Sequence, residues 1–417
     1  MVKEQSRAQA PGVFLPAFPD SGPDGSVALK KGFLFKKSRD RAALSAIKFK
    51  SPWKRREFRV HESSKLQYWK DEVLFGEIPS LTGAAIVDKE KSEADDHEFA
   101  FEIQTADENL LLYAETREDF KDWTDVLRSV SDGSWQAIKR AIILRDLLQI
   151  DAAQTIVIVY DIDALKDALT ASRTDVSNLP DIFFVNYLDC IIGKVRAYIS
   201  IDAEFARVMR EHLTGFRVRL TSVPPEEIGG KYYQSRFNDD GEYVLAFNKT
   251  QVGVNTFDIA DDLTTLLTDG GYPYLLMRGI RMFRGKGDEH LKVIGELVGV
   301  TDVTFDLCLA ENYESMKVTP GTYTDEQFGA LMFESHLQCL LNQIRNAVGS
   351  NPGYAAAFRD RFKSKKIVIK PTTDASLIKQ NYASSFTPEG DLLIQYKKDM
   401  FIINLGYIGM DLPAILS

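Results

Sequence analysis

The sequence predicts an N-terminal domain of antiparallel β-strands closed by a helix, followed by an α+β part made of two tandem copies of one unit. In residues 30–60 apolar side chains alternate with Lys and Arg, which is the period of a strand with one buried face. An amphipathic helix pattern follows near residue 120. Further on, residues 183–263 and 332–412 match each other without a gap at a shift of 149 residues.

The first domain contains six segments with the alternation or the apolar content of strands. They are residues 30–37, 53–60, 66–70, 76–81, 99–105 and 110–114. After them, Phe120, Trp123 and Leu127 have the spacing of one face of a helix. We therefore expect a β-rich domain that ends with a helix.

These segments, in this order, resemble a pleckstrin homology (PH) domain over residues 30–131. The resemblance rests on Gly32-x-Leu34-x-Lys36, on Trp53-Lys54-x-Arg56-x-Phe58, on Leu66-Gln67-Tyr68-Trp69-Lys70 and on a Trp in the last helix. It implies a seven-stranded β-barrel that the C-terminal helix caps.

Charge is distributed very unevenly along the chain. Residues 30–60 contain twelve Lys or Arg and two acidic residues, a local charge of +10, whereas the whole chain carries −9. Everything outside this window therefore sums to −19. This separation predicts that one end of the molecule faces polyanions.

The resemblance also implies a site for inositol phosphate headgroups. Lys36 matches the basic residue of the first strand, and Lys54 and Arg56 match the basic pair of the second. Phosphates favour such clustered ammonium and guanidinium donors. Trp69 occupies the position of a tyrosine that often contacts a phosphate, so we expect its indole N–H or Lys70 to take over that contact.

The long loop after the first strand is expected to reach the lipid interface. Its basic and apolar candidates are Arg39, Arg41, Ile47, Lys48, Phe49 and Lys50. A PH domain that holds only proteins is the alternative, because one fold serves several functions. The sequence does not select a particular phosphoinositide.

The duplicated part predicts two α+β units, residues 138–268 and 289–417, joined by a Gly-rich linker at 269–288. Fifteen of the 81 aligned positions are identical, where chance gives about five. Each unit is expected to place two helices on an antiparallel sheet. The helices are expected at 183–200 and 202–213 in the first unit, and at 327–348 and 351–362 in the second. The strands of the sheet are expected at 217–223, 242–248 and 252–259, and at 366–372, 391–396 and 400–405. Asp262 and Asp411 are placed to start a short final helix.

Composition excludes several other classes of protein. Three cysteines without paired spacing argue against a disulfide framework and for a reducing compartment. The histidines and cysteines have no metal-ligand spacing, so we expect neither metal nor cofactor. Residues 1–29 are rich in Pro and Gly and predict a flexible tail. No apolar segment is long enough to cross a bilayer, so membrane contact would be peripheral and the protein cytoplasmic.

Two hypotheses for function remain open. In the first, the protein is a non-enzymatic adaptor or scaffold whose PH domain binds an anionic membrane and whose acidic α+β half binds a protein partner, with no nucleic acid involved. In the second, the α+β half is an enzyme or enzyme regulator that the PH domain targets. A protein-binding PH domain in a cytoskeletal or ciliary assembly is a further alternative. The polar identities between the copies are scattered and form no catalytic group, which favours the adaptor.

Overall fold

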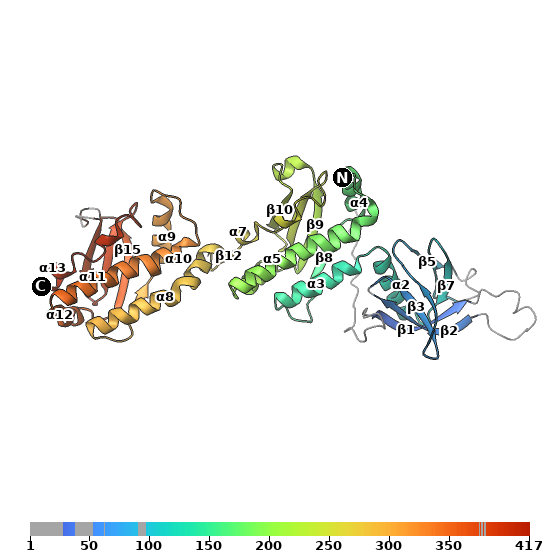
Figure 1. Ribbon diagram of the computed structural model, residues 1–417, viewed down its shortest axis with the longest axis horizontal. Coiled ribbons are helices and arrows are strands. Elements are labelled where there is room, and N and C mark those ends of the chain that lie inside the picture. Colours follow the sequence, from blue (N-terminus) through green and yellow to red (C-terminus); the bar gives the residue numbers. More distant parts are fainter. Residues whose placement is uncertain are drawn as a thin grey trace, which may run out of the picture. The chain divides into compact units, whose positions relative to one another are not determined.

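The computed structural model of the protein describes residues 28–37, 53–61, 63–90, 97–374, 376, 378 and 381–417. The chain divides into two compact units, residues 1–263 and 264–417 (Figure 1). The first unit holds the β-rich domain and an α+β domain, and the second holds another α+β domain. Among the described helices, none has the length and apolar content that crossing a membrane requires.

The N-terminal domain is one sheet of seven strands in which all neighbours are antiparallel, as the sequence predicted. The strands are β1 (Ala28–Lys37), β2 (Trp53–His61), β3 (Leu66–Lys70), β4 (Val73–Ile78), β5 (Ala85–Lys89), β6 (Ala100–Gln104) and β7 (Asn109–Tyr113). Their order is β4-β3-β2-β1-β7-β6-β5, so β4 and β5 are the end strands. β5 was not among the expected strands. The expected tail is shorter than 1–29, because β1 already begins at Ala28, which is buried. Residues 1–27 lie outside the described part.

Helix α2 (Arg117–Ser131) closes this domain and confirms the predicted apolar face. Thr116 caps the helix, since its side chain accepts a hydrogen bond from the backbone N–H of Asp119. Trp123 and Leu127 are buried in the core of the domain. Trp123 packs next to Gly32, where an added Cβ would lie 3.3 Å from the indole ring. The glycine of the first strand motif therefore leaves room for the tryptophan.

The α+β domain of the first unit consists of helices around a four-stranded sheet. Its helices are α3 (Trp135–Leu147), α4 (Ile162–Ala171), the π-helical η2 (Pro180–Tyr187) that continues into α5 (Leu188–Ile201), α6 (Phe205–His212) and α7 (Leu263–Leu266). Its strands are β8 (Val157–Val159), β9 (Arg217–Val223), β10 (Tyr233–Phe237) and β11 (Tyr243–Asn248). The sheet order is β10-β11-β9-β8.

The α+β domain of the second unit has the same order of elements. Its helices are α8 (Tyr274–Val298), α9 (Leu309–Val318), α10 (Gln327–Ala330) continuing through the π-helical η5 (Leu331–His336) into α11 (Leu337–Ser350), α12 (Gly353–Arg361) and α13 (Leu412–Leu416). Its strands are β14 (Thr304–Asp306), β15 (Lys366–Thr372), β16 (Tyr382–Phe386) and β17 (Leu392–Lys397). The short pair β12 (Thr268–Asp269) and β13 (Tyr272–Pro273) precedes α8.

The prediction of antiparallel sheets in these domains is wrong. Only the hairpin strands, β10 with β11 and β16 with β17, are antiparallel, whereas β11, β9 and β8 pair in parallel, as do β17, β15 and β14. The parallel partners β8 and β14 were missed because three residues are too short to show a period. Residues 252–259 and 400–405, expected as strands, are turns with short 3-10 helices.

The expected linker at 269–288 is also corrected. Most of it belongs to α8, whose residues Leu276, Ile280 and Ile294 lie in the core of the second unit. Glycine suggested flexibility in the sequence, but here it permits close packing. A Cβ added to Gly287 would lie 2.3 Å from the ring of Phe333.

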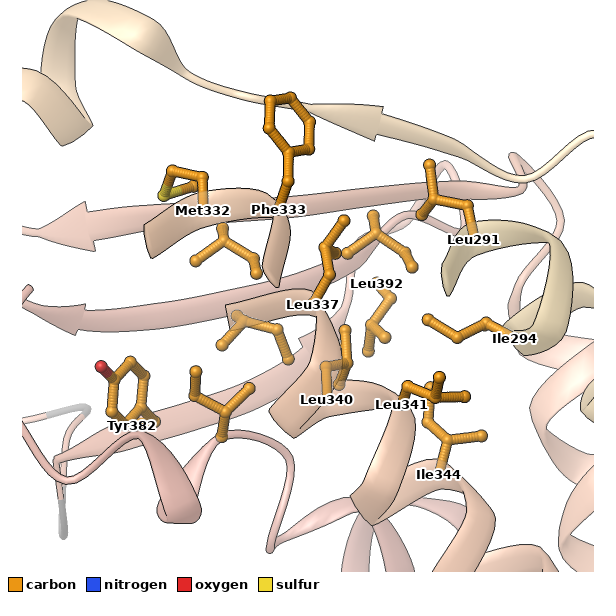
Figure 2. Close-up of a cluster of buried hydrophobic side chains, with 14 of the residues drawn as sticks. Leu291, Ile294, Met332, Phe333, Leu337, Leu340, Leu341, Ile344, Tyr382 and Leu392 are labelled. Carbon is orange, nitrogen blue, oxygen red and sulfur yellow. The ribbon is translucent and has the colours of Figure 1, made fainter. Parts of the chain in front are cut away.

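Helices α8 and α11 bury their apolar faces together with the sheet (Figure 2). Leu291 and Ile294 come from α8, and Leu392 comes from the central part of the sheet. The buried face of α11 consists of Leu337, Leu340, Leu341 and Ile344. In the first unit α5 buries Leu188, Ile191, Ile192 and Val195, at the same helical spacing. The structure thus contains helices where the sequence predicted them at 183–200 and 327–348.

Two glycines allow α8 and α10 to touch backbone to backbone. A Cβ on Gly329 would lie 2.0 Å from the carbonyl oxygen of Gly279, and a Cβ on Gly279 would lie 2.2 Å from that of Glu326. Backbone atoms cannot move aside as a flexible side chain can. Any side chain at this crossing therefore forces the two helices apart.

A buried carboxylate links the strands of the first α+β sheet. The side chain of Glu242 is 2% exposed and accepts hydrogen bonds from Arg219 at 2.9 and 3.1 Å and from Arg217 at 3.2 Å. Hydrogen bonds from Arg219 lower the pKa of Glu242 from 4.5 to about 2. In the second unit Asp391, 149 residues later, pairs with Lys366 at 3.3 Å.

The helix crossing predicts a stability difference between two glycine substitutions. Gly329→Ala is expected to destabilise the second unit by roughly 2–3 kcal/mol, because its Cβ overlaps the α8 backbone. Gly349→Ala is the control, since that glycine is also helical and has no atom within 4 Å of the added Cβ. Urea denaturation would compare them. Equal stability of the two variants would contradict the close crossing.

The Glu242 cluster predicts a pH dependence. Because its pKa is lower in the folded state, its contribution to stability is present above pH 4.5 and is lost as the pH falls toward 2. Both arginines are partly exposed, so we expect the cluster to contribute only about 1–2 kcal/mol to the free energy of unfolding. Urea denaturation at neutral and acid pH should show that Glu242→Gln is less stable than wild type at pH 7 and converges with it in acid. The exposed Glu227→Gln should match wild type throughout; if Glu242→Gln behaves in the same way, the cluster is not stabilising.

Candidate anion-binding site

The register of β1 and β2 brings the three predicted cations together. Lys36 lies opposite Lys54, and Leu34 lies opposite Arg56. Leu34 and Phe58 are fully buried, so the face that they share with the cations is the core face of the sheet. At the end of β1 and the beginning of β2, this face reaches solvent. The side chains that it carries there are Lys36, Lys54 and Arg56.

Aromatic rings hold two of these cations in place. The Lys36 Nζ lies 3.9 Å from the centre of the Tyr68 ring, and the Arg56 guanidinium lies 5.1 Å from that of Phe75. Tyr68 is opposite Phe58 in the β2–β3 pair and packs against the core. Cations over ring faces gain electrostatic stabilisation and lose freedom. The cluster is therefore partly ordered without any ligand.

The structure corrects the position expected for Trp69. It pairs with Glu57, so it lies on the other face of the sheet, and the Arg59 guanidinium covers its ring at 4.6 Å. Its indole Nε1 is buried and has no hydrogen-bond partner among the described residues. Tyr68 takes the place beside Lys36 instead. Alternation with Leu66 in β3 was the signal that could have identified Tyr68 from the sequence. Lys70 is exposed and shares the face of Tyr68 by alternation.

Several other cations of the basic strands are ion-paired, on both faces of the sheet. Away from the cluster, Lys31 and Arg59 both pair with Glu57, at 3.5 and 2.6 Å, and Arg55 lies 3.9 Å from Glu115. Lys30 pairs with Asp122. Within the described part of the chain, no carboxylate lies within 4.0 Å of the cations of the cluster. Their charge is therefore available to an anion from outside.

The loop residues predicted to meet the membrane fall between Lys37 and Trp53. Arg39, Arg41, Ile47, Lys48, Phe49 and Lys50 all lie outside the described residues. The last pair of β1 and β2 before these residues is Lys37 with Trp53, next to the Lys36–Lys54 pair.

The α+β domains contain two cysteines at equivalent positions, Cys190 and Cys339, and both are partly exposed. No group of three or more His, Cys, Asp or Glu within the described ranges could hold a metal ion. Desolvation raises the pKa of each of the two thiols. Such thiols are protonated at neutral pH and are poor nucleophiles.

Comparison with known proteins points to the same region. The sequence model of the family described as "PH domain" matches residues 28–132. Among similar solved structures, the carboxyl-terminal PH domain of pleckstrin is 29% identical with a TM-score of 0.21, and the match covers 25% of this chain and 97% of that one. The same domain in complex with D-myo-Ins(1,2,3,4,5)P5 is 30% identical with a TM-score of 0.20 and coverages of 25% and 99%. The PH domain of the human pleckstrin homology domain-containing protein family A member 5 is 17% identical with a TM-score of 0.22 and coverages of 30% and 91%. No curated protein matches the sequence.

The family match and the fold coincide along the chain. The seven antiparallel strands and the helix that buries Trp123 occupy residues 28–131, and the family model ends one residue later. The predicted resemblance is thereby confirmed. Residues 28–132 of this chain therefore form a PH domain.

Proposed function

We propose that this protein is a peripheral membrane adaptor. Its PH domain binds the phosphorylated headgroup of a phosphoinositide through Lys36, Lys54 and Arg56, and its α+β domains bind a protein partner. The observation that carries the proposal is the set of three cations that share one face and have no carboxylate partner among the described residues, on strands where Lys30, Lys31, Arg55 and Arg59 are ion-paired. A phosphomonoester supplies the missing negative charge and several acceptor oxygens.

The proposal places the protein in the cytoplasm, at the inner surface of a membrane. Anionic lipids give that surface a negative potential, which attracts the basic window at residues 30–60. The domain is also polarised, because residues 61–131 carry −11 against the +10 of the window. A domain with such a separation of charge is oriented by the surface field with its cluster toward the lipid.

We further propose that the α+β domains are tandem copies of one ancestral unit. Support comes from the common strand order and directions in the two sheets. The same polar contact also recurs: Asp262 accepts from the backbone N–H of Ser235 at 2.9 Å, and Asp411 accepts from that of Ser384 at 2.7 Å. These aspartates were expected to cap the helix that follows, but their carboxylates bind the neighbouring strand.

The recurrent polar residues support a binding role for these domains. The hydroxyl of Tyr233 donates to the carbonyl of Val254, and that of Tyr382 lies 3.2 Å from the carbonyl of Phe401. Side chains committed to backbone groups are not available as acids, bases or nucleophiles. We therefore propose that the α+β domains are non-enzymatic and act by presenting surfaces to a protein.

The headgroup site can be tested with a matched pair of double variants. Lys36→Ala with Arg56→Ala should weaken binding of the full chain to phosphoinositide-containing phosphatidylcholine vesicles by about 1–3 kcal/mol, since charge-assisted contacts are lost. Lys31→Ala with Arg55→Ala removes the same charge from the same strands on the other face and should have a much smaller effect. Vesicle sedimentation at physiological salt measures both. Equal losses would indicate non-specific attraction and contradict a headgroup site.

The adaptor role predicts that membrane binding and partner binding are separable. Full-length protein carrying Lys36→Ala and Arg56→Ala should retain the same proteins from a cell extract as wild type, because the substitutions lie outside the α+β domains. Affinity capture followed by mass spectrometry measures this. A PH domain that itself holds the partner would instead lose it in this variant. Turnover of a metabolite by purified protein would favour the enzyme alternative.

A further inference from the structure

Strand β4 begins with three consecutive apolar side chains that are largely exposed. Val73 is 67% exposed, Leu74 44% and Phe75 61%, whereas Ile78 at the other end of the strand is 1% exposed. A strand on a core normally exposes alternate residues, so a run of three is unusual. β4 is an end strand of the sheet, and Asp71 and Glu72 form the turn before it, both with positive φ. We call Val73, Leu74 and Phe75 the apolar tip.

The apolar tip adjoins the cationic cluster. The ring of Phe75 lies 6.2 Å from that of Tyr68, whose other neighbour is the Lys36 ammonium at 3.9 Å. The Arg56 guanidinium lies over Phe75 itself. Gly76 permits this arrangement, because a Cβ there would lie 2.2 Å from the Tyr68 hydroxyl oxygen. Phe75 therefore places the apolar tip directly beside the cations, and Leu74, opposite Trp69, extends the tip onto the other face of the sheet at the end of the hairpin.

We propose that the apolar tip enters the interfacial layer of the bilayer whose headgroup the cationic cluster binds. This inference rests on the proposed function and adds a second contact to it. A free inositol phosphate would engage only the cations, and the tip would remain in water. An anionic bilayer offers phosphates and hydrocarbon side by side, which matches the cationic cluster and the apolar tip.

The turn limits how deep the tip can go. Asp71 and Glu72 are exposed carboxylates directly before Val73. They must stay hydrated and are repelled by anionic lipid, so only the side chains of the tip penetrate and the backbone remains at headgroup level. Lys70 on the same hairpin offsets part of this repulsion. The contact is therefore shallow, and it depends on the headgroup site for its strength.

The test compares a membrane ligand with a soluble one, using the full chain. The probes are phosphatidylcholine vesicles containing phosphatidylinositol phosphates and free inositol pentakisphosphate. The double variant Val73→Ser with Leu74→Ser, which keeps the Phe75 ring beside Arg56, should bind these vesicles about ten-fold more weakly, since its apolar area no longer leaves water. Its affinity for inositol pentakisphosphate should be unchanged. Phe257→Ser, which alters a side chain 68% exposed in the first α+β domain, is the control and should bind both probes normally.

A gain-of-binding variant and a depth measurement complete the test. Asp71→Asn with Glu72→Gln should strengthen vesicle binding without changing inositol pentakisphosphate binding. The fluorescence of Leu74→Trp should be quenched by lipids brominated near the headgroup, beyond the quenching of wild type, whereas Phe257→Trp should show no added quenching. Circular dichroism establishes that each variant is folded.

The possible failures are distinguishable. If Val73→Ser with Leu74→Ser binds vesicles like wild type while Lys36→Ala with Arg56→Ala does not, the tip proposal is overturned and the headgroup site stands. If Val73→Ser with Leu74→Ser loses both probes, these side chains support the headgroup site structurally and the bilayer contact is overturned as well. If Lys36→Ala with Arg56→Ala retains both probes, the proposed function itself fails.

Discussion

The pairing of β1 with β2 is the constraint on which the candidate site depends. Side chains of a strand alternate between faces, so burying Leu34 and Phe58 in the core fixes which residues of each strand point inward. The same face then carries Lys36, Lys54 and Arg56, because each lies an even number of residues from Leu34 or Phe58 on its strand. A slip of one residue would bury cations and expose the core. The free energy of apolar burial therefore also positions the charges.

The positive charge of β1 and β2 falls into two groups. Four of the cations, Lys30, Lys31, Arg55 and Arg59, lie within 4.0 Å of a carboxylate of the domain. Lys36 and Arg56 lie over aromatic rings, which orient them without cancelling their charge. The same strands thus supply both internal ion pairs and an unneutralised cluster. Net charge alone would not reveal this difference.

The distribution of negative charge refines the interpretation of the sequence. Of the −19 outside the basic window, −11 lies in residues 61–131 of the PH domain itself, and the second unit, 264–417, carries only −1. The α+β half is thus less acidic than the total suggests. Electrostatic orientation at a membrane would arise chiefly within the PH domain, from its basic and acidic parts.

In the two α+β domains, one type of polar contact occurs at equivalent positions that lie 149 residues apart. Glu242 with Arg217 and Asp391 with Lys366 tie equivalent strands together. Glu in the first contact corresponds to Asp in the second, and Arg corresponds to Lys. Both contacts thus join one acid to one base, as a role in folding allows. Burial makes such contacts costly to lose, because an unpaired charge would remain in the interior.

The sequence by itself determined the features that have a local period. Alternation predicted β1, β2 and β3, helical spacing predicted the buried face of α2, and the period of the apolar residues predicted the helices α5 and α11. The order of these strand segments and of the final helix along the chain was enough to predict the PH domain.

Only the tertiary structure decided the features that depend on partners distant in sequence. The strands β8 and β14 are too short to show a period, and their parallel pairing with β9 and β15 is a property of the assembled sheet. Gly279 and Gly287 suggested a linker, because a sequence does not show whether a glycine serves flexibility or a close contact. The apolar tip was identified by the exposure of its side chains. In each case the deciding quantity is a contact or its absence, which no local pattern contains.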